Sequence, residues 1–164
     1  MKTLLLLRHA KSSWDDPSLA DHDRPLKPRG TKAAHRIGRL LRRHSLHPDA
    51  VLCSTAVRAK ETLRLVLEET GIQPPVAYSE GLFHCPPSEF ALTLRQVDAA
   101  VTTVLLIGHN PGLEEFLSQL TGHPETLPTA ALARLEVDLS DWSQFSETTH
   151  ARLVDLWRPK ELDA

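Results

Sequence analysis

Short apolar runs recur along the chain, each bounded by polar residues, glycine or proline. Runs of this length and setting are typical of buried strands in a parallel sheet. They predict strands at residues 3–7, 50–53, 76–78 and 102–107. Two later β-like segments, 130–137 and 151–156, predict further strands that extend the sheet at an antiparallel edge.

Between these runs, apolar residues recur every three or four positions, which is the period of a helix with one buried face. This spacing predicts helices at residues 31–44, 55–70 and 88–97. It also predicts a fourth helix that Asn110 caps, with Pro111 at its first position and Gly122 after its end. The alternation of strands and helices predicts an α/β protein, a three-layer α/β/α fold with a mostly parallel central sheet flanked by helices.

Polar side chains follow three of the predicted strands. Arg8 and His9 come directly after the first strand, Arg58 follows the second, and His109 follows the strand at 102–107. Because parallel strands of an open α/β sheet place their carboxyl ends at one edge, we expect these side chains to meet there. Two arginines and two histidines in one cavity are suited to binding a phosphate.

Each of these residues also has a plainer interpretation. If Thr55 caps its helix, Arg58 lies in the first turn, where the helix dipole favours an anion nearby. Arg58 is equally explained as a surface arginine paired with Glu61. His9 can be a satisfied core histidine, and His109 a loop histidine that bonds the backbone. The joint occurrence at three strand ends favours the phosphate site.

Composition excludes several classes of protein. Hydrophobic residues are 41% and charged residues 24% of the 164 residues, and the formal net charge is −2. A strongly basic surface for nucleic acid is absent, and no apolar run reaches the ~18 residues of a membrane span. Cys53 and Cys85 lack the spacing of a zinc site or a disulfide framework. We therefore expect a cytoplasmic protein that binds neither nucleic acid nor membrane and needs no metal or other cofactor.

Three segments carry a family resemblance. Residues 6–14 read LLRHAKSSW, residues 54–62 read STAVRAKET, and residues 108–110 read GHN. They resemble the three motifs of the histidine phosphatase superfamily, which includes phosphoglycerate mutases and many phosphatases. Within it the chain is most similar to the short SixA-type phosphohistidine phosphatases, through residues 8–12, 23–26 and 29–30 and its small size. The resemblance covers nearly the whole chain and implies a single domain, residues 1–164.

The resemblance implies roles for individual residues. His9 becomes the nucleophile that is phosphorylated during turnover, and Arg8, Arg58 and His109 complete the phosphate pocket. Glu80, the nearest match to the general acid of relatives that cleave alcohol phosphates, is a candidate acid and equally a solvated loop carboxylate. Ser12, close to the first motif, is a further candidate for phosphate binding. Thr129 is expected nearby.

The resemblance also implies the kind of substrate. Imidazole leaves readily from a phosphohistidine, so a chain whose candidate acid is Glu80 alone fits this N–P substrate better than an alcohol phosphate. Ala10 replaces the glycine of the commoner R-H-G motif, which argues against mutase activity. The leading hypothesis is a metal-independent phosphatase that acts on phosphohistidine in a partner protein. The alternatives are a phosphomonoesterase on small metabolites, favoured if Glu80 lies over the pocket, and a non-catalytic phosphate- or phosphoprotein-binding module.

One further charged feature stands apart from these motifs. Lys32, Arg36, Arg39 and Arg43 fall along one side of the helix predicted at 31–44. They form either a solvated face or a surface that docks an acidic partner.

Overall fold

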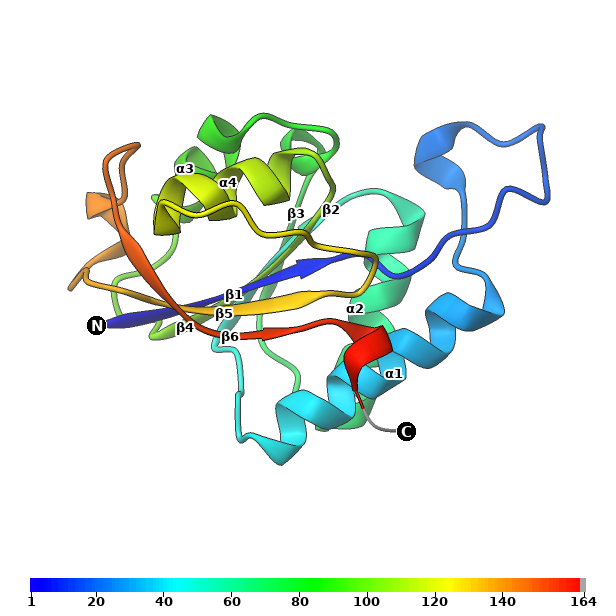
Figure 1. Cartoon of the computed structure of the whole chain (residues 1–164), viewed down its shortest axis with the longest axis horizontal. Helices are drawn as coiled ribbons and strands as arrows, with labels where there is room; N and C mark the ends of the chain where they lie inside the picture. Colours follow the sequence, from blue (N-terminus) through cyan, green and yellow to red (C-terminus); the bar gives the residue numbers. More distant parts are fainter. Residues whose placement is uncertain (163–164) are drawn as a thin grey trace.

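The computed structural model describes residues 1–162, whose six strands form one sheet in the order β3-β2-β4-β1-β5-β6 (Figure 1). The strands are β1 Lys2–Arg8, β2 Ala50–Ser54, β3 Val76–Ser79, β4 Thr103–Gly108, β5 Leu132–Val137 and β6 Ala151–Trp157. β1 to β4 run parallel, whereas β5 is antiparallel to β1, and β6 is antiparallel to β5. The predicted mostly parallel sheet with an antiparallel edge is confirmed.

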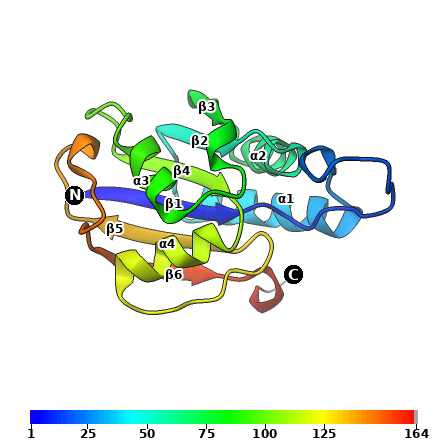
Figure 2. The ribbon, with the colours of Figure 1, turned by 90° about the horizontal axis from the view of Figure 1, so that it is seen from above.

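Helices cover both faces of this sheet. They are α1 Pro28–Arg43, α2 Val57–Thr70, α3 Pro87–Leu94 and α4 Gly112–Thr121. α1 and α2 pack on one face, and α3 and α4 pack on the other (Figure 1 and Figure 2). The predicted three-layer α/β/α fold is therefore confirmed.

The central strand β1 shows how the sequence builds two cores. Leu4 and Leu6 pack into the apolar cluster on the α3 and α4 face, and Leu5 and Leu7 pack into the cluster on the α1 and α2 face. All four side chains are fully buried. Burying each leucine contributes roughly 1.5–3 kcal/mol, so this strand is firmly held on both sides up to the residue before Arg8.

Several predicted helix boundaries were wrong. α1 begins at Pro28 rather than Thr31, because the fixed backbone angle of proline suits a first helical turn. α3 ends at Leu94, three residues before Val97. Asn110 does not cap α4, which begins at Gly112, because its side-chain amide donates to Glu114 Oε2 and to the Leu127 carbonyl instead.

The strand order places the site. β4 lies between β1 and β2, although it follows both of them in the sequence. The carboxyl ends of β1, β4 and β2 are therefore neighbours. Open α/β sheets bind ligands where the strand order reverses in this way. The segment after β1, residues 9–27, extends beyond this edge of the sheet before it returns to α1 (Figure 1).

Gly30 allows the start of α1 to pack closely against the segment that follows β1. A Cβ atom on Gly30, in the first turn of α1, would clash with the Lys11 carbonyl oxygen. The Lys27 amide also donates to this carbonyl, at 3.1 Å. The start of α1 is thus packed directly against the backbone two residues after His9.

Candidate active site

Strand register brings the two predicted histidines together. Arg8 at the end of β1 is paired with Gly108 at the end of β4, and the His9 amide donates to the Gly108 carbonyl at 3.2 Å. His9 and His109 are therefore the first residues beyond two adjacent parallel strands. Their rings lie with centroids 5.0 Å apart.

A cavity of about 310 Å³ opens at this edge. Its lining comes from all three motif segments, from the segment 9–27 and from the loops before α3 and β5: Arg8, His9, Lys11, Ser12, Trp14, Asp21, Arg24, Arg58, His84, His109, Asn110 and Thr129. The lining contains four residues with permanently cationic side chains and a single carboxylate, which makes it an anion-binding environment.

Several polar atoms around this cavity lack a partner within the protein. Among the described residues, the buried side-chain atoms without a hydrogen bond include Arg8 Nε, Arg58 Nε and His109 Nδ1. Buried donors without partners are rare because leaving one unsatisfied costs about 1–3 kcal/mol. These three atoms are enclosed, and the acceptor Asn110 Oδ1 in the same cavity wall also lacks a partner, so the polar groups around this cavity are not fully paired within the protein.

His9 is held in one tautomer. Its Nδ1 lies 2.8 Å from the Ala10 carbonyl oxygen, which can only accept, so Nδ1 carries the hydrogen. The Nε2 atom then bears the free lone pair, makes no hydrogen bond within the protein and is not enclosed. Burial, followed by the nearby charges of Arg58 and Arg8, lowers the pKa of His9 to about 3. The ring is neutral at physiological pH.

His109 is fixed by a neighbour on β2. Its Nε2 lies 2.7 Å from Ser54 Oγ, and this oxygen also accepts from the Ala56 amide at 3.2 Å. Ser54 is fully buried, so its hydroxyl hydrogen has His109 Nε2 as its acceptor, and Nδ1 of His109 becomes the N–H donor. Burial, followed by electrostatic repulsion from His9 and Arg58, lowers the pKa of His109 to about 2.

Arg58 is a buried arginine of the cavity, only 2% exposed, and its interpretation as a surface residue paired with Glu61 is wrong. It donates from Nη1 to the Asp21 carbonyl at 2.6 Å and from Nη2 to Asp21 Oδ2 at 3.1 Å. Glu61 instead accepts from the Leu26 amide. Thr55 is not the cap of α2 either; Ala56 is the capping residue.

Asp21 is the centre of a polar cluster that sequence reasoning missed. Besides Arg58, its carboxylate accepts from Arg24 Nε at 3.0 Å and from His84 Nε2 at 2.9 Å. The hydrogen bonds from His84 and Arg24 and the charge of Arg58 outweigh burial and hold the pKa of Asp21 well below its usual range. Asp21 is thus an anion that already occupies the arginine-rich part of the cavity.

Arg24 joins this cluster to the first motif. Its Nη1 donates to Ser12 Oγ at 2.7 Å, and the Trp14 ring stacks on its guanidinium, 3.5 Å from Cζ to the ring centroid. Arg24 lies within the segment that carries the SixA resemblance, which was the available signal for it. No local pattern marked Asp21 or His84, since both reach the cavity through long-range contacts.

The structure brings most of the candidate residues together. Arg8, His9, Ser12, Arg58, His109 and Thr129 line the cavity. Glu80 is not among its lining residues and its side chain is exposed, because Leu82 in the same short helix, Glu80–Leu82, faces the core. His84, four residues later, lies over the cavity in its place.

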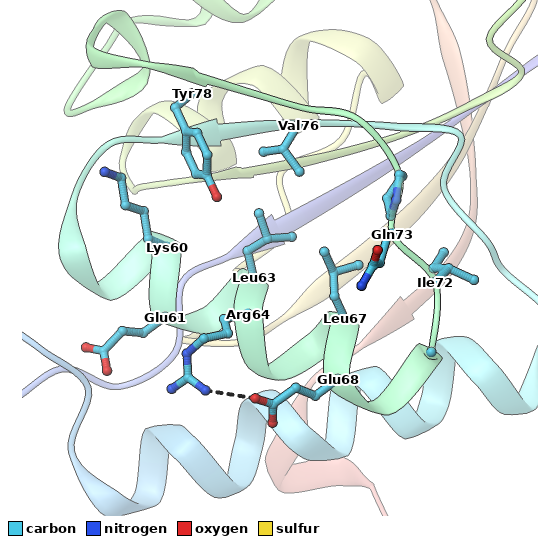
Figure 3. Close-up of a pocket in the computed structure, with 12 residues that line it drawn as sticks. Lys60, Glu61, Leu63, Arg64, Leu67, Glu68, Ile72, Gln73, Val76 and Tyr78 are labelled. Carbon is cyan, nitrogen blue, oxygen red and sulfur yellow. Dashed lines mark hydrogen bonds and ion pairs between the residues drawn. The ribbon is translucent and has the colours of Figure 1, made fainter.

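A larger cavity of about 690 Å³ lies elsewhere, between α2 and the edge strand β3 (Figure 3). Leu63 and Leu67 of α2 point toward Val76 and Tyr78 of β3, and Lys60 lies over the Tyr78 ring. Its lining combines apolar side chains with the charged residues Lys60, Glu61, Arg64 and Glu68, and it contains none of the motif histidines. Size therefore does not identify the candidate active site; the chemistry of the lining does.

Within residues 1–162, no group of three or more His, Cys, Asp or Glu side chains is arranged to hold a metal ion. No helix in the same residues is long and apolar enough to cross a membrane.

Comparison with known proteins identifies the class. Residues 4–83 match the model of the histidine phosphatase superfamily, branch 1. A Mycobacterium tuberculosis protein of uncharacterized function is 40% identical over 142 residues, which cover 80% of this chain and 87% of that protein. The chain belongs to the histidine phosphatase superfamily.

Solved structures place it more narrowly. A Nakamurella multipartitia protein, provisionally assigned as the phosphohistidine phosphatase SixA, is 30% identical with a TM-score of 0.82 over 96% of both chains. The protein histidine phosphatase SixA complexed with tungstate shares the fold, with a TM-score of 0.85 and 22% identity over 98% of this chain and 99% of that one. The chain is of the SixA type within the superfamily, and these relatives support a phosphatase function.

Proposed function

We propose that this protein is a metal-independent cytoplasmic phosphatase that removes phosphate from phosphohistidine on another protein, through a phosphohistidine intermediate on His9. The observation that carries the proposal is the state of His9. Its Nδ1–H is engaged by the Ala10 carbonyl, its ring is neutral, and its Nε2 lone pair faces a cavity rich in arginine. An imidazole fixed in this way is a competent nucleophile toward phosphorus.

In the first step, the His9 Nε2 lone pair attacks phosphorus and forms a P–N bond while the P–N bond of the substrate breaks. The substrate imidazole leaves with that electron pair and takes up a proton. Arg8 and Arg58, which line the cavity beside His109, neutralise the charge that spreads over the three equatorial oxygens. This charge neutralisation by side chains is the basis for proposing a mechanism without a metal.

In the second step, water attacks the phosphorylated His9. A P–O bond forms, the P–N bond returns its electron pair to Nε2, the proton of the water passes to a base, and inorganic phosphate leaves. His84 lines the cavity and bears a hydrogen on Nε2, shared with Asp21. We assign His84 as the proton carrier for both steps, in the role first sought at Glu80.

The cavity supports a protein substrate over a small metabolite. Lys11 and Trp14 are exposed at its rim, so nothing among the described residues encloses a small molecule there. Glu80 does not line the cavity, which removes the observation on which the phosphomonoesterase alternative depended. A module that binds phosphate without turnover has no use for a nucleophile held in one tautomer.

The test compares substrates side by side. The protein is incubated with a protein phosphorylated on histidine, the same protein phosphorylated on serine, and p-nitrophenyl phosphate. We expect preferential release of phosphate from phosphohistidine, and a phosphorylated enzyme whose adduct is lost in acid but survives alkali. His9→Ala should abolish both, whereas His123→Ala, an exposed histidine outside the cavity, should change neither. Faster hydrolysis of the monoesters, or an adduct that persists in His9→Ala, would overturn the proposal.

A further inference from the structure

A second cavity adjoins the candidate active site and shares Lys11 and Thr129 with it. Its volume is about 220 Å³. Five of its lining residues are cationic, and none of the nine is acidic: Lys11, Arg29, Lys32, Ala33, Arg36, Pro128, Thr129, Pro159 and Lys160. We call this the basic cavity.

The cations of the basic cavity are not neutralised by the protein that the structure describes. Within residues 1–162, none of the five forms an ion pair; Arg36 donates to the Pro159 carbonyl at 3.0 Å. Arg39, one turn further along α1, is by contrast paired with Glu69. Like charges in one cavity repel one another, and an anionic group that binds among them reduces this repulsion.

The position of the cluster strengthens this argument. Arg29 and Lys32 lie at the start of α1, whose first turn contains no acidic residue. The N-terminus of a helix carries a partial positive charge, so cations placed there raise the positive potential further and favour the binding of an anion. The close packing of Gly30 on the Lys11 backbone joins the start of α1 to the segment that follows His9. An anion bound here therefore lies next to the phosphate cavity.

The lining of the basic cavity favours a chain of acidic residues over one compact ion. Its cations come from three separate parts of the chain, namely the segment after β1, the helix α1 and Lys160 in the short helix Pro159–Glu161. Ala33, Pro128 and Pro159 provide apolar surface between them. Several carboxylates spaced along a polypeptide match such spread charges.

We propose that the basic cavity docks an acidic stretch of the partner protein, next to the phosphohistidine that enters the active-site cavity. This inference rests on the proposed function, because it assumes a phosphorylated protein as the substrate. The shared residues Lys11 and Thr129 require the two parts of the partner to be neighbours on its surface. Charges at the rim of an interface act mainly on encounter and specificity, so docking lowers KM and leaves kcat nearly constant.

The experiment uses two synthetic peptides with the same phosphohistidine, one flanked by four glutamates and the other by four glutamines. At low ionic strength we expect the wild-type protein to favour the glutamate peptide roughly tenfold in kcat/KM, through KM. The double variant Arg29→Gln, Lys32→Gln should lose this preference. The control Arg39→Gln, Arg43→Gln removes the same charge from the same helix outside the cavity and should keep it. All three proteins should hydrolyse free phosphoramidate at the same rate.

The outcomes are distinguishable. Equal hydrolysis of the two peptides by the wild-type protein would overturn the docking proposal and leave the proposed function standing. Turnover of phosphomonoesters without turnover of either peptide would overturn both. A fall in phosphoramidate hydrolysis in the Arg29, Lys32 variant would make those residues part of the phosphate pocket. A third peptide with phosphoserine in place of the glutamates, if preferred over the glutamate peptide, would reassign the basic cavity to a second phosphate.

Discussion

Removing the charge of Arg58 is the sharpest test of the phosphate pocket. The side chain is buried at the start of α2 and holds Asp21 through two hydrogen bonds. Arg58→Met keeps an unbranched chain of similar length but loses the guanidinium. Arg58→Ala removes the packing as well. Comparing the two separates the loss of charge from the loss of volume.

The magnitude follows from two effects that act in the same direction. A preorganised donor to a charged transition state contributes roughly 2–4 kcal/mol, which is about a 30- to 1000-fold change in rate. In addition, the Asp21 carboxylate stays in the cavity, still bonded to Arg24 and His84, and now repels the incoming phosphate with one neutralising charge fewer. We therefore expect kcat/KM to fall toward the upper part of that range, and tungstate to bind far more weakly.

The assay is phosphoramidate hydrolysis with tungstate inhibition, and a thermal melt of each variant verifies that it is folded. Arg64→Ala is the matched control, because Arg64 lies on the same helix, is exposed and pairs only with Glu68 at the surface. Such a pair contributes under about 1 kcal/mol, and the control should retain nearly full activity. Unchanged tungstate affinity in a folded Arg58→Met protein would refute the assignment of Arg58 to the phosphate pocket.

Three further predictions follow from the same geometry. Burial lowers the pKa of His9 to about 3 and of His109 to about 2, below the ~6.5 of an unfolded histidine, so the unfolded state binds more protons. The melting temperature should therefore decline as pH falls from ~6.5 toward ~3, and it should decline less steeply in His109→Gln. Equal slopes in the wild-type protein and in this variant would contradict the prediction. Glu80→Gln should keep phosphohistidine turnover within about tenfold, whereas His84→Gln should lower kcat by roughly 10²–10⁴-fold; the opposite result would restore Glu80 as the acid. Gly30→Ala should reduce kcat/KM and lower the free energy of unfolding in a denaturant melt by about 1–3 kcal/mol, because its methyl group meets the Lys11 carbonyl. Full activity would show that residues 9–27 can shift without disturbing the site.

The sheet could be predicted from sequence because its cause is local. Leu4 to Leu7 form an unbroken apolar run, and such a run buried on both faces needs helices on both sides. Once the strands are parallel and adjacent, His9 and His109 meet without further information. The same reasoning placed Arg58 at this edge. That residues 1–164 form a single domain stays a prediction.

The rest of the site depends on where long segments return, which no local pattern specifies. Asp21 meets Arg58 across 37 positions of sequence, through a segment with few apolar residues to guide it. Glu80 matched a motif position, but the short helix that turns Leu82 inward leaves Glu80 outside. Asn110 and Thr55 had the right residue type for helix caps and found other partners, Leu127 and His22. Side-chain competition of this kind is decided by tertiary structure.

The segment from His9 to Lys27 and the sheet are held by different forces. The sheet is stabilised by buried leucines, whereas the Asp21 carboxylate ties that segment to Arg58 and the guanidinium of Arg24 binds Ser12 within it, with Trp14 left 71% exposed. Concentrated salt, or acid strong enough to protonate Asp21 despite its lowered pKa, weakens the second set of interactions and spares the first. Local opening of this kind occurs at a lower free energy than global unfolding. The protein should thus be inactivated well before it is denatured, with a sheet that remains intact around a disassembled catalytic centre.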